Sequence, residues 1–209
     1  MPDRPICIDL FAGVGGMSLG FEQAGFHVAC AVEIDPVHCA AHKYNFPYTS
    51  VICKDIEQVT SADIRSMSGI GDRRIGVVIG GSPCQGFSMM GKRSLDDPRN
   101  SLVIHFMRLV TTLKPDYFVL ENVKGLTVGK HKAFLEEVVD GFRNSGYEIT
   151  LPWKVLNAAS FGVPQHRERL FLMGARAGLP CPSYPLPIFN GALAKKQTIV
   201  LPTGPTVSD

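Results

Sequence analysis

The chain has 209 residues, of which 45% are hydrophobic and 19% are charged, and its formal net charge is +2. This composition is typical of one globular domain, and no apolar run approaches the roughly 18 residues of a membrane-spanning helix. The small net charge leaves the partner open, because nucleic-acid binding depends on a local basic face and not on the sum over the chain. The first residues lead directly into an apolar run without a cleavage pattern, so we expect a cytoplasmic protein without membrane association.

Short apolar runs alternate with helix-like stretches along the chain, which predicts an α/β fold with a doubly wound, mostly parallel sheet. In such folds ligands bind beyond the carboxyl ends of the strands. The predicted strands are Ile6–Phe11, Val28–Val32, Ile75–Ile79, Tyr117–Leu120 and Leu170–Met173. The predicted helices are Met17–Ala24, Pro36–Tyr44, Ser101–Thr112 and Lys132–Asn144.

The end of the chain differs from the rest. From Leu179 it becomes rich in Pro and Gly and loses its periodicity. No internal repeat divides the part before it. We therefore expect one folded domain in residues 1–178 and a linker in residues 179–209.

Three glycines gather where the first predicted strand meets the first helix, in the stretch Asp9-Leu10-Phe11-Ala12-Gly13-Val14-Gly15-Gly16. Glycine permits positive φ and has no Cβ, so this turn can lie against a bound molecule. The dinucleotide pattern G-x-G-x-x-G fails because residue 18 is Ser, which argues against a pyrophosphate ligand. A purely structural strand-to-helix turn is the alternative.

Two acidic residues extend this pattern. Glu33 ends the second predicted strand, where nucleoside-binding folds place a carboxylate for the ribose hydroxyls, and Asp55 follows a further strand-like run. Either residue alone is more often a capping or surface residue. Together with the glycine turn they indicate adenosine without pyrophosphate, a description that fits S-adenosylmethionine.

The cysteines and histidines offer a possible metal site. Six cysteines are scattered without paired spacing, so we expect free, buried thiols and no disulfide scaffold. His38, Cys39 and His42 share one predicted helix, and the two histidines have the i, i+4 spacing of some zinc sites. Because no second pair of ligands is evident, we interpret them as a helix surface and predict no metal.

One thiol, Cys84, stands on a Gly- and Pro-framed loop after the predicted strand Ile75–Ile79, which is an active-site position. At this point the chain strongly resembles the bacterial DNA cytosine-5 methyltransferases, whose motifs recur in the family's order over most of its length. These motifs are DLFAGVGG from Asp9, EID from Glu33, DI at Asp55, GGSPCQGFS from Gly80, ENV from Glu121 and QHRER from Gln165.

The resemblance implies the Rossmann-like fold of S-adenosylmethionine-dependent methyltransferases, with an antiparallel last strand and with residues 1–178 as the catalytic unit. It implies S-adenosylmethionine as donor and S-adenosylhomocysteine as product. Glu33 would then bind the ribose, and Pro83 would lie near the reactive end of the cofactor. The residues implied around the cofactor are Asp9, Phe11, Ala12, Gly13, Gly15, Gly16, Glu33, Ile34, Asp55, Ile56, Pro83 and Leu102.

By the same resemblance Cys84 is the nucleophile. Cytosine C5 lies in an electron-poor aromatic ring, and addition of a thiolate at C6 activates it. Glu121, at the end of a predicted strand, is the candidate donor at N3, where electron density builds up. Arg167 and Arg169 alternate in an extended segment and should project to one face, with Arg169 on the base and Arg167 supporting the loop. As isolated residues, all three would be read as capping or solvated groups.

The implied partner is double-stranded DNA, from which the target base must be flipped because it is inaccessible in the stack. Candidate phosphate contacts are Lys92, Arg93, Arg99, Lys124, Lys130 and Lys132. Members of the family continue past QHRER into a target-recognition region. We therefore expect that the chain is cut short or that a second polypeptide supplies this region, and that the chain alone methylates poorly.

Three other functions compete with this one. A nicotinamide-dependent dehydrogenase should carry G-x-G-x-x-G, which this turn lacks. A non-catalytic nucleic-acid-binding module of the same fold is disfavoured by the presence of Cys84, Glu121 and Arg169 together. An RNA cytosine-5 methyltransferase is the nearest competitor, and only a substrate assay separates it from a DNA enzyme.

Overall fold

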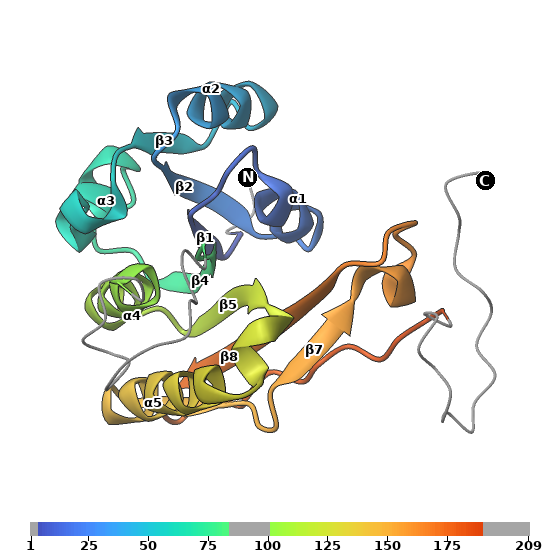
Figure 1. Cartoon of the computed structure of the whole chain (residues 1–209). Coiled ribbons are helices and arrows are strands. Elements are labelled where there is room, and N and C mark those ends of the chain that lie inside the picture. Colours follow the sequence, from blue (N-terminus) through green and yellow to red (C-terminus); the bar gives the residue numbers. More distant parts are fainter. Residues whose placement is uncertain (1–3, 84–100, 190–209) are drawn as a thin grey trace.

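The computed structural model describes residues 4–83 and 101–189 of the chain (Figure 1). Its strands are β1 Ile6–Leu10, β2 His27–Glu33, β3 Ser50–Cys53, β4 Ile75–Gly81, β5 Tyr117–Val123, β6 Tyr147–Ile149, β7 Lys154–Asn157 and β8 Glu168–Arg176. Its α-helices are α1 Gly16–Gln23, α2 Pro36–Asn45, α3 Ser61–Met67, α4 Ser101–Leu113 and α5 Lys130–Asn144, and short 3-10 helices are η1 Ile56–Gln58, η4 Lys124–Thr127 and η5 Ala158–Phe161. Within these two ranges, none of the helices has the length and apolar character needed to cross a membrane.

The strands form one sheet in the order β3-β2-β1-β4-β5-β8-β6, with β7 paired to β8 beside this path. Strands β1 to β5 pair in parallel, whereas β8 runs antiparallel to β5, β6 and β7. The order reverses between β1 and β4, which is the point where open α/β sheets bind ligands. The predicted α/β class, with a mostly parallel sheet and an antiparallel last strand, is confirmed.

Apolar clusters cover both faces of the sheet. Strand β1 is buried along its whole length: Ile6, Ile8 and Leu10 join the large cluster that includes α3, α4 and α5. Cys7 lies in a smaller cluster with Phe21 of α1. Because side chains of a strand alternate between faces, Asp9 shares the α1 face with Cys7. The polar residue that begins the glycine motif is thus placed beneath α1.

Aromatic rings hold α4 and α5 against the sheet. Phe142 of α5 stacks on Phe118 of β5 with ring centroids 4.0 Å apart, and it meets Phe106 and Tyr147 edge-on. Gly174 of β8 makes room for this cluster, because a Cβ there would lie 2.3 Å from the Phe118 ring. The cluster fixes β5 and β8 as neighbours, and both strands carry candidate site residues.

The predicted strands and helices are all present, with ends shifted by a few residues, but β6, β7 and α3 were not predicted. Strands of three or four residues show too few alternations to reveal a period. Helix α3 did carry a usable signal: Thr60 accepts a hydrogen bond from the Asp63 amide, and the Asp63 carboxylate accepts one from the Thr60 amide. This reciprocal capping box marks a helix start.

Replacing Phe142 with Ala should lower the free energy of unfolding by about 3 to 5 kcal/mol, because it removes a fully buried ring that contacts three others. Urea unfolding followed by circular dichroism measures this loss. The control is Tyr48→Ala, since Tyr48 is 85% exposed. Equal unfolding midpoints for the two variants would contradict the proposed role of the cluster.

Candidate active site

The turn between β1 and α1 adopts the conformation for which its glycines were singled out. Gly13 and Gly15 have φ of 54° and 99°, and Phe11 also has a positive φ of 60°. Positive φ is rare for a residue with a side chain and is a common sign of a functional position. At Gly15 the space is closed as well, because a Cβ would lie 2.2 Å from the ring of Phe46.

Glu33 joins this turn to the next one. Its Oε2 accepts a hydrogen bond from the amide of Gly13 at 2.8 Å, and its Oε1 accepts one from the amide of Asp35 at 3.0 Å. The side chain is only 11% exposed. A carboxylate has about four lone-pair sites, so each oxygen can still accept from a ligand hydroxyl. The carboxylate therefore sets the spacing of the two turns at the carboxyl ends of β1 and β2.

A cavity of about 250 Å³ opens at these strand ends; we call it the small cavity. Most of its walls are apolar, with carboxylates beside them, which suits a flat aromatic base joined to a sugar with hydroxyl groups. Seven of the residues implied around the cofactor line it, together with Val32, Lys54 and Glu57, which the sequence analysis missed. The lining residues are Phe11, Val32, Glu33, Ile34, Lys54, Asp55, Ile56, Glu57, Pro83 and Leu102.

The remaining residues implied around the cofactor lie outside the small cavity. Gly13, Gly15 and Ala12 belong to the turn, where the amide of Ala12 donates to the carbonyl of Val32. Gly16 lines a different, larger cavity. Asp9 is 1% exposed, and its Oδ2 accepts a hydrogen bond from the Ser18 hydroxyl at 2.6 Å. Asp9 thus lies behind the turn and not in the wall of the small cavity.

The floor of the small cavity is tied to α4. The Asp55 carboxylate caps η1 by accepting from the amide of Glu57, and Glu57 lies 3.6 Å from Nε2 of His105 in α4. Arg108 of α4 donates to the carbonyl of Ile56 at 2.8 Å. These contacts fix the first turns of α4, so Leu102 is held against the small cavity.

Glu121 and the two predicted arginines meet at one point. The guanidinium of Arg169 lies 3.0 Å from Oε1 of Glu121, and that of Arg167 lies 3.6 Å from the same oxygen. Both arginines therefore project to one face, as their alternation predicts. Gly81 of β4, the register partner of Glu121, leaves room for this carboxylate, since a Cβ there would lie 3.2 Å from Oε2.

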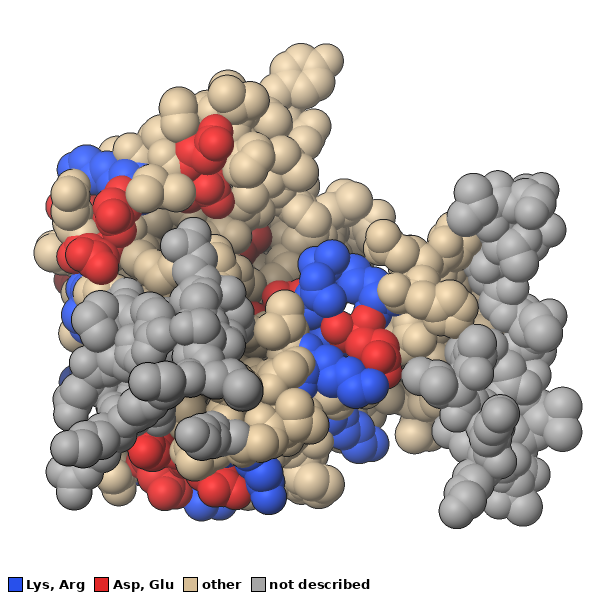
Figure 2. Space-filling model, viewed as in Figure 1, with Lys and Arg blue, Asp and Glu red and all other residues tan. Residues whose placement is uncertain are grey.

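A second ion pair lies beside this cluster, between Lys124 and Glu168 at 2.9 Å. Figure 2 shows Lys and Arg side chains gathered around acidic ones at the edge of a hollow in this face. Glu121, Arg167 and Arg169 also line a cavity of about 590 Å³, the large cavity, whose other walls are mostly apolar residues of α1, β5, β7 and β8. The cluster thus lies at a concave, partly charged surface.

The chain that leads to Cys84 is fixed next to this cluster. Asn122, the residue after Glu121, donates from Nδ2 to both the carbonyl and the hydroxyl of Ser82 at 3.1 Å. Both side chains are buried. Pro83 follows and lines the small cavity. Cys84 itself, like Lys92, Arg93 and Arg99, lies outside the described residues.

The residues considered as a metal site do not form the helix surface that we expected, because Cys39 and His42 are buried against neighbouring elements. His38 is half exposed and lies 3.8 Å from Glu33, Cys39 contacts the carbonyl of Glu33, and His42 is buried against Ser18. Across residues 4–83 and 101–189, no group of three His, Cys, Asp or Glu side chains could hold a metal ion. The five cysteines in these ranges are free thiols.

Comparison with known proteins gives a consistent picture. A family model described as C-5 cytosine-specific DNA methylase matches residues 6–206. The type II methyltransferase M.XorII of Xanthomonas oryzae is 63% identical over 184 residues, which cover 88% of this chain and 43% of that protein. The type II methyltransferase M.AquIA of Picosynechococcus is 46% identical over 178 residues, which cover 82% of this chain and 72% of that protein.

A solved structure, described as a DNA modification methyltransferase encoded within an E. coli prophage, superposes with a TM-score of 0.72 and 38% identity over 83% of this chain and 47% of that one. The Spodoptera frugiperda DNMT2 structure, at 23% identity and a TM-score of 0.66, shares the fold. The chain spans about half the length of most curated relatives that it matches.

The buried Asp9 should make stability depend on pH. Burial, with the nearby Glu33 adding to it, raises the pKa of Asp9 from 3.8 to about 7 although the hydrogen bond from Ser18 opposes this. Between these values the folded chain keeps a proton that the unfolded chain has lost, so the contribution of Asp9 to stability falls as the pH rises from 4 to 7.

Replacing Asp9 with Asn should therefore stabilise the protein relative to the parent increasingly from pH 5 to pH 8, by at most about 4 kcal/mol at 1.4 kcal/mol per pKa unit. Urea unfolding at four pH values measures the difference. Asp140→Asn is the control, because Asp140 is exposed on α5. Parallel stability curves for Asp9→Asn and the parent would show that Asp9 does not titrate in this range.

Proposed function

The chain belongs to the C-5 cytosine-specific DNA methylase family, and on this premise we propose that it transfers a methyl group from S-adenosylmethionine to C5 of cytosine in double-stranded DNA. The observation that carries the proposal is the position of Pro83. This residue lines the small cavity, while Asn122 binds the preceding Ser82 beside Glu121 and its arginines. Cys84 follows Pro83 in the sequence, and we propose that it acts between a cofactor site and a base site.

The small cavity is the proposed site of the cofactor. Its apolar walls, Phe11, Ile34 and Leu102 among them, suit adenine, and the Glu33 carboxylate suits the ribose hydroxyls. The turn that contains Gly13 would receive the amino-acid end, since a Cβ there meets nothing within 4 Å. When bound, S-adenosylmethionine supplies an electrophilic methyl group on its sulfonium. No metal is proposed in the reaction.

Cys84 is the proposed nucleophile. Its thiolate forms a bond to C6 of cytosine, which breaks the C5–C6 double bond and makes C5 electron-rich. C5 would then take the methyl group from the sulfonium, with S-adenosylhomocysteine as the leaving group. Transfer of the C5 proton to a base such as water would let the thiolate leave C6 and restore the aromatic ring. Covalent addition thus divides one difficult substitution into easier steps.

Glu121, Arg167 and Arg169 are the proposed base contacts. In its protonated form Glu121 would donate to N3, where electron density accumulates when sulfur adds to C6. Arg169, 25% exposed and 3.0 Å from Glu121, would donate to the cytosine O2, and Arg167 would support the same carboxylate. A flipped cytosine would bring its O2 and N3 edge to this cluster.

The partner proposals extend beyond the described residues. We propose that double-stranded DNA lies over the surface of mixed charge around Lys124, and that a target-recognition region on the rest of the protein or on a second polypeptide supplies sequence specificity. The apolar walls of the large cavity support such a further covering element. The names of the relatives, type II methyltransferases, support a type II modification role, and we propose that the protein acts in the bacterial cytosol or nucleoid. The division into a catalytic unit, residues 1–178, and a linker, residues 179–209, stays a proposal.

Ile34 offers a direct test of the cofactor site. It lines the small cavity but is 63% exposed, so a ligand there would bury apolar surface that the fold leaves open. Replacing it with Ala should weaken S-adenosylmethionine binding about five- to tenfold, through a loss of roughly 1 kcal/mol of apolar burial, with unfolding unchanged. Isothermal titration calorimetry measures the affinity.

The matched control for Ile34 is Val37→Ala. Val37 is 72% exposed on the first turn of α2 and does not line the small cavity, so its loss should not change the affinity. If both variants bound S-adenosylmethionine like the parent, the ligand would not occupy the small cavity.

The covalent step can be trapped. The chain, with any polypeptide that completes it, is incubated with S-adenosylmethionine and duplex DNA that carries 5-fluorocytosine, whose fluorine blocks elimination of the thiolate. Mass spectrometry should then find a protein–DNA adduct on Cys84. Cys84→Ala should abolish the adduct while cofactor affinity stays within about threefold, whereas Cys181→Ala, which changes an exposed thiol, should leave adduct formation intact.

A full yield of adduct with Cys84→Ala would remove the basis of the mechanism. The same experiment with fluorinated RNA distinguishes the competing substrate class. An adduct with RNA and none with DNA would assign the chain to RNA methylation.

A further inference from the structure

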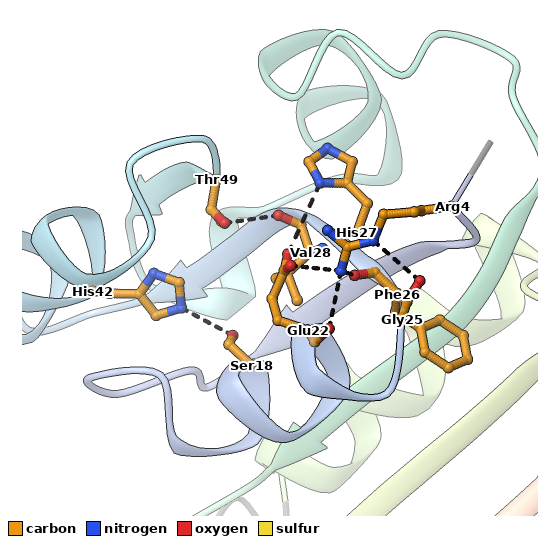
Figure 3. A network of polar contacts seen from close by, with 9 residues as sticks. All are labelled: Arg4, Ser18, Glu22, Gly25, Phe26, His27, Val28, His42 and Thr49. Carbon is orange, nitrogen blue, oxygen red and sulfur yellow. Dashed lines mark hydrogen bonds and ion pairs between the residues drawn. The ribbon is translucent and has the colours of Figure 1, made fainter. Parts of the chain in front are cut away.

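A buried chain of hydrogen bonds lies behind the glycine turn. The Ser18 hydroxyl of α1 donates to Oδ2 of Asp9 at 2.6 Å, and the Ser18 hydroxyl oxygen lies 3.0 Å from Nε2 of His42 in α2. Figure 3 shows His42 pointing from its helix toward Ser18. The exposed fractions of Asp9, Ser18 and His42 are 1%, 0% and 0%. These hydrogen bonds thus link β1, which precedes the turn, to α1, which follows it, and to α2 of the next βα unit.

The same histidine also packs against the turn. A Cβ at Gly15 would lie 3.2 Å from Cδ2 of His42 and 2.2 Å from the ring of Phe46, so the two rings form the surface on which Gly15 rests. Their centroids are 4.8 Å apart. His42 therefore touches the turn through packing and reaches its flanking helix through a hydrogen bond.

The two ring nitrogens of His42 indicate that its role goes beyond packing. Nδ1 of His42 is buried and has no hydrogen-bond partner among the described residues. Burial lowers the pKa of His42, so the ring is neutral near pH 7 and one nitrogen carries the proton. A buried polar atom without a partner costs stability, and a phenylalanine would keep an aromatic ring here without this cost. We therefore infer that the hydrogen bond between Nε2 and the Ser18 hydroxyl is the reason for a histidine at this position.

We propose that His42 is a positioning residue that, through Ser18 and Gly15, holds the turn of residues 11–16 in the shape that receives the cofactor. This inference rests on the proposed function, because the turn borders the small cavity through Phe11. Ser18, near the start of α1, makes side-chain hydrogen bonds to Asp9 and His42, and without His42 only the bond to Asp9 remains. The turn would then have to be ordered when the ligand binds, which lowers affinity.

The test compares variants that change the ring packing and the hydrogen bond of His42 separately. His42→Phe keeps an aromatic ring beside Gly15 but cannot bond Ser18, whereas the amide nitrogen of His42→Gln can take the place of Nε2. Calorimetric titration of the 209-residue chain with S-adenosylhomocysteine should show about tenfold weaker binding for His42→Phe and for Ser18→Ala. His42→Gln should stay within about threefold of the parent, as should Tyr44→Phe, a control on the exposed face of the same helix.

The double variant His42→Phe/Ser18→Ala identifies the route of the effect. If His42 acts through Ser18, its replacement should add less than about threefold to the loss caused by Ser18→Ala. Losses that multiply to about a hundredfold would show independent effects and overturn the proposal. Equal affinities of His42→Phe and the parent, or failure of His42→Gln to restore binding, would overturn it as well.

Hydrogen exchange separates this inference from the cofactor proposal. The amide of Gly15 donates to the carbonyl of Ala12, and that of Gly13 donates to Glu33, so both report the order of the turn without any ligand. Their exchange should be at least tenfold faster in His42→Phe and unchanged in His42→Gln. Unchanged exchange in His42→Phe would refute the positioning role. Faster exchange in His42→Phe, together with a parent chain that does not bind S-adenosylhomocysteine, would support the positioning role and refute the cofactor proposal.

Discussion

The carboxylate of Glu33 links the two turns on which the proposed cofactor site depends. It accepts hydrogen bonds from the amides of Gly13 and Asp35, and these amides begin the connections to α1 and α2. Because β1 and β2 are parallel neighbours, their carboxyl ends leave the sheet side by side, and one buried carboxylate can fix both exits. Burial is the main cause of the raised pKa of Asp9, and the negative charge of Glu33 adds to it. Glu33 thus bonds the turn, lines the small cavity and acts on Asp9 behind the turn.

The antiparallel strand β8 supplies the other half of the site. Parallel strands β4 and β5 end at the same edge of the sheet, and an antiparallel strand must begin there. The start of β8 carries Arg169, and its register partner Val123 lies two residues beyond Glu121. Residues that are almost fifty positions apart in the chain thus meet within 3.0 Å. The aromatic cluster around Phe118 holds this pair of strands together from the opposite face.

Hydrogen bonds between separate elements hold the backbone on both sides of the small cavity. Asn122 and Ser82 fix the approach to Cys84 through buried hydrogen bonds, and α4 is tied to η1 through Arg108 and the carbonyl of Ile56. A buried polar group lowers stability unless it is hydrogen-bonded, so each of these pairs favours the one arrangement in which both partners are bonded. These paired groups favour a preformed pocket at the proposed cofactor site over one created by binding.

The sequence by itself determined the fold class, the main strands and the glycine turn, because these depend on local periodicity and on residues with unusual backbone freedom. It also placed Glu33, Ile34 and Asp55 at strand ends, and the known order of an α/β sheet brings such ends together. Strands β6 and β7 were not predicted, because they are too short to show a period. Only the tertiary structure could place Asp9 behind the turn, add Lys54 and Glu57 to the small cavity, and join Ser18 to His42. Such contacts arise from the packing of separate elements, and no spacing along the chain encodes them.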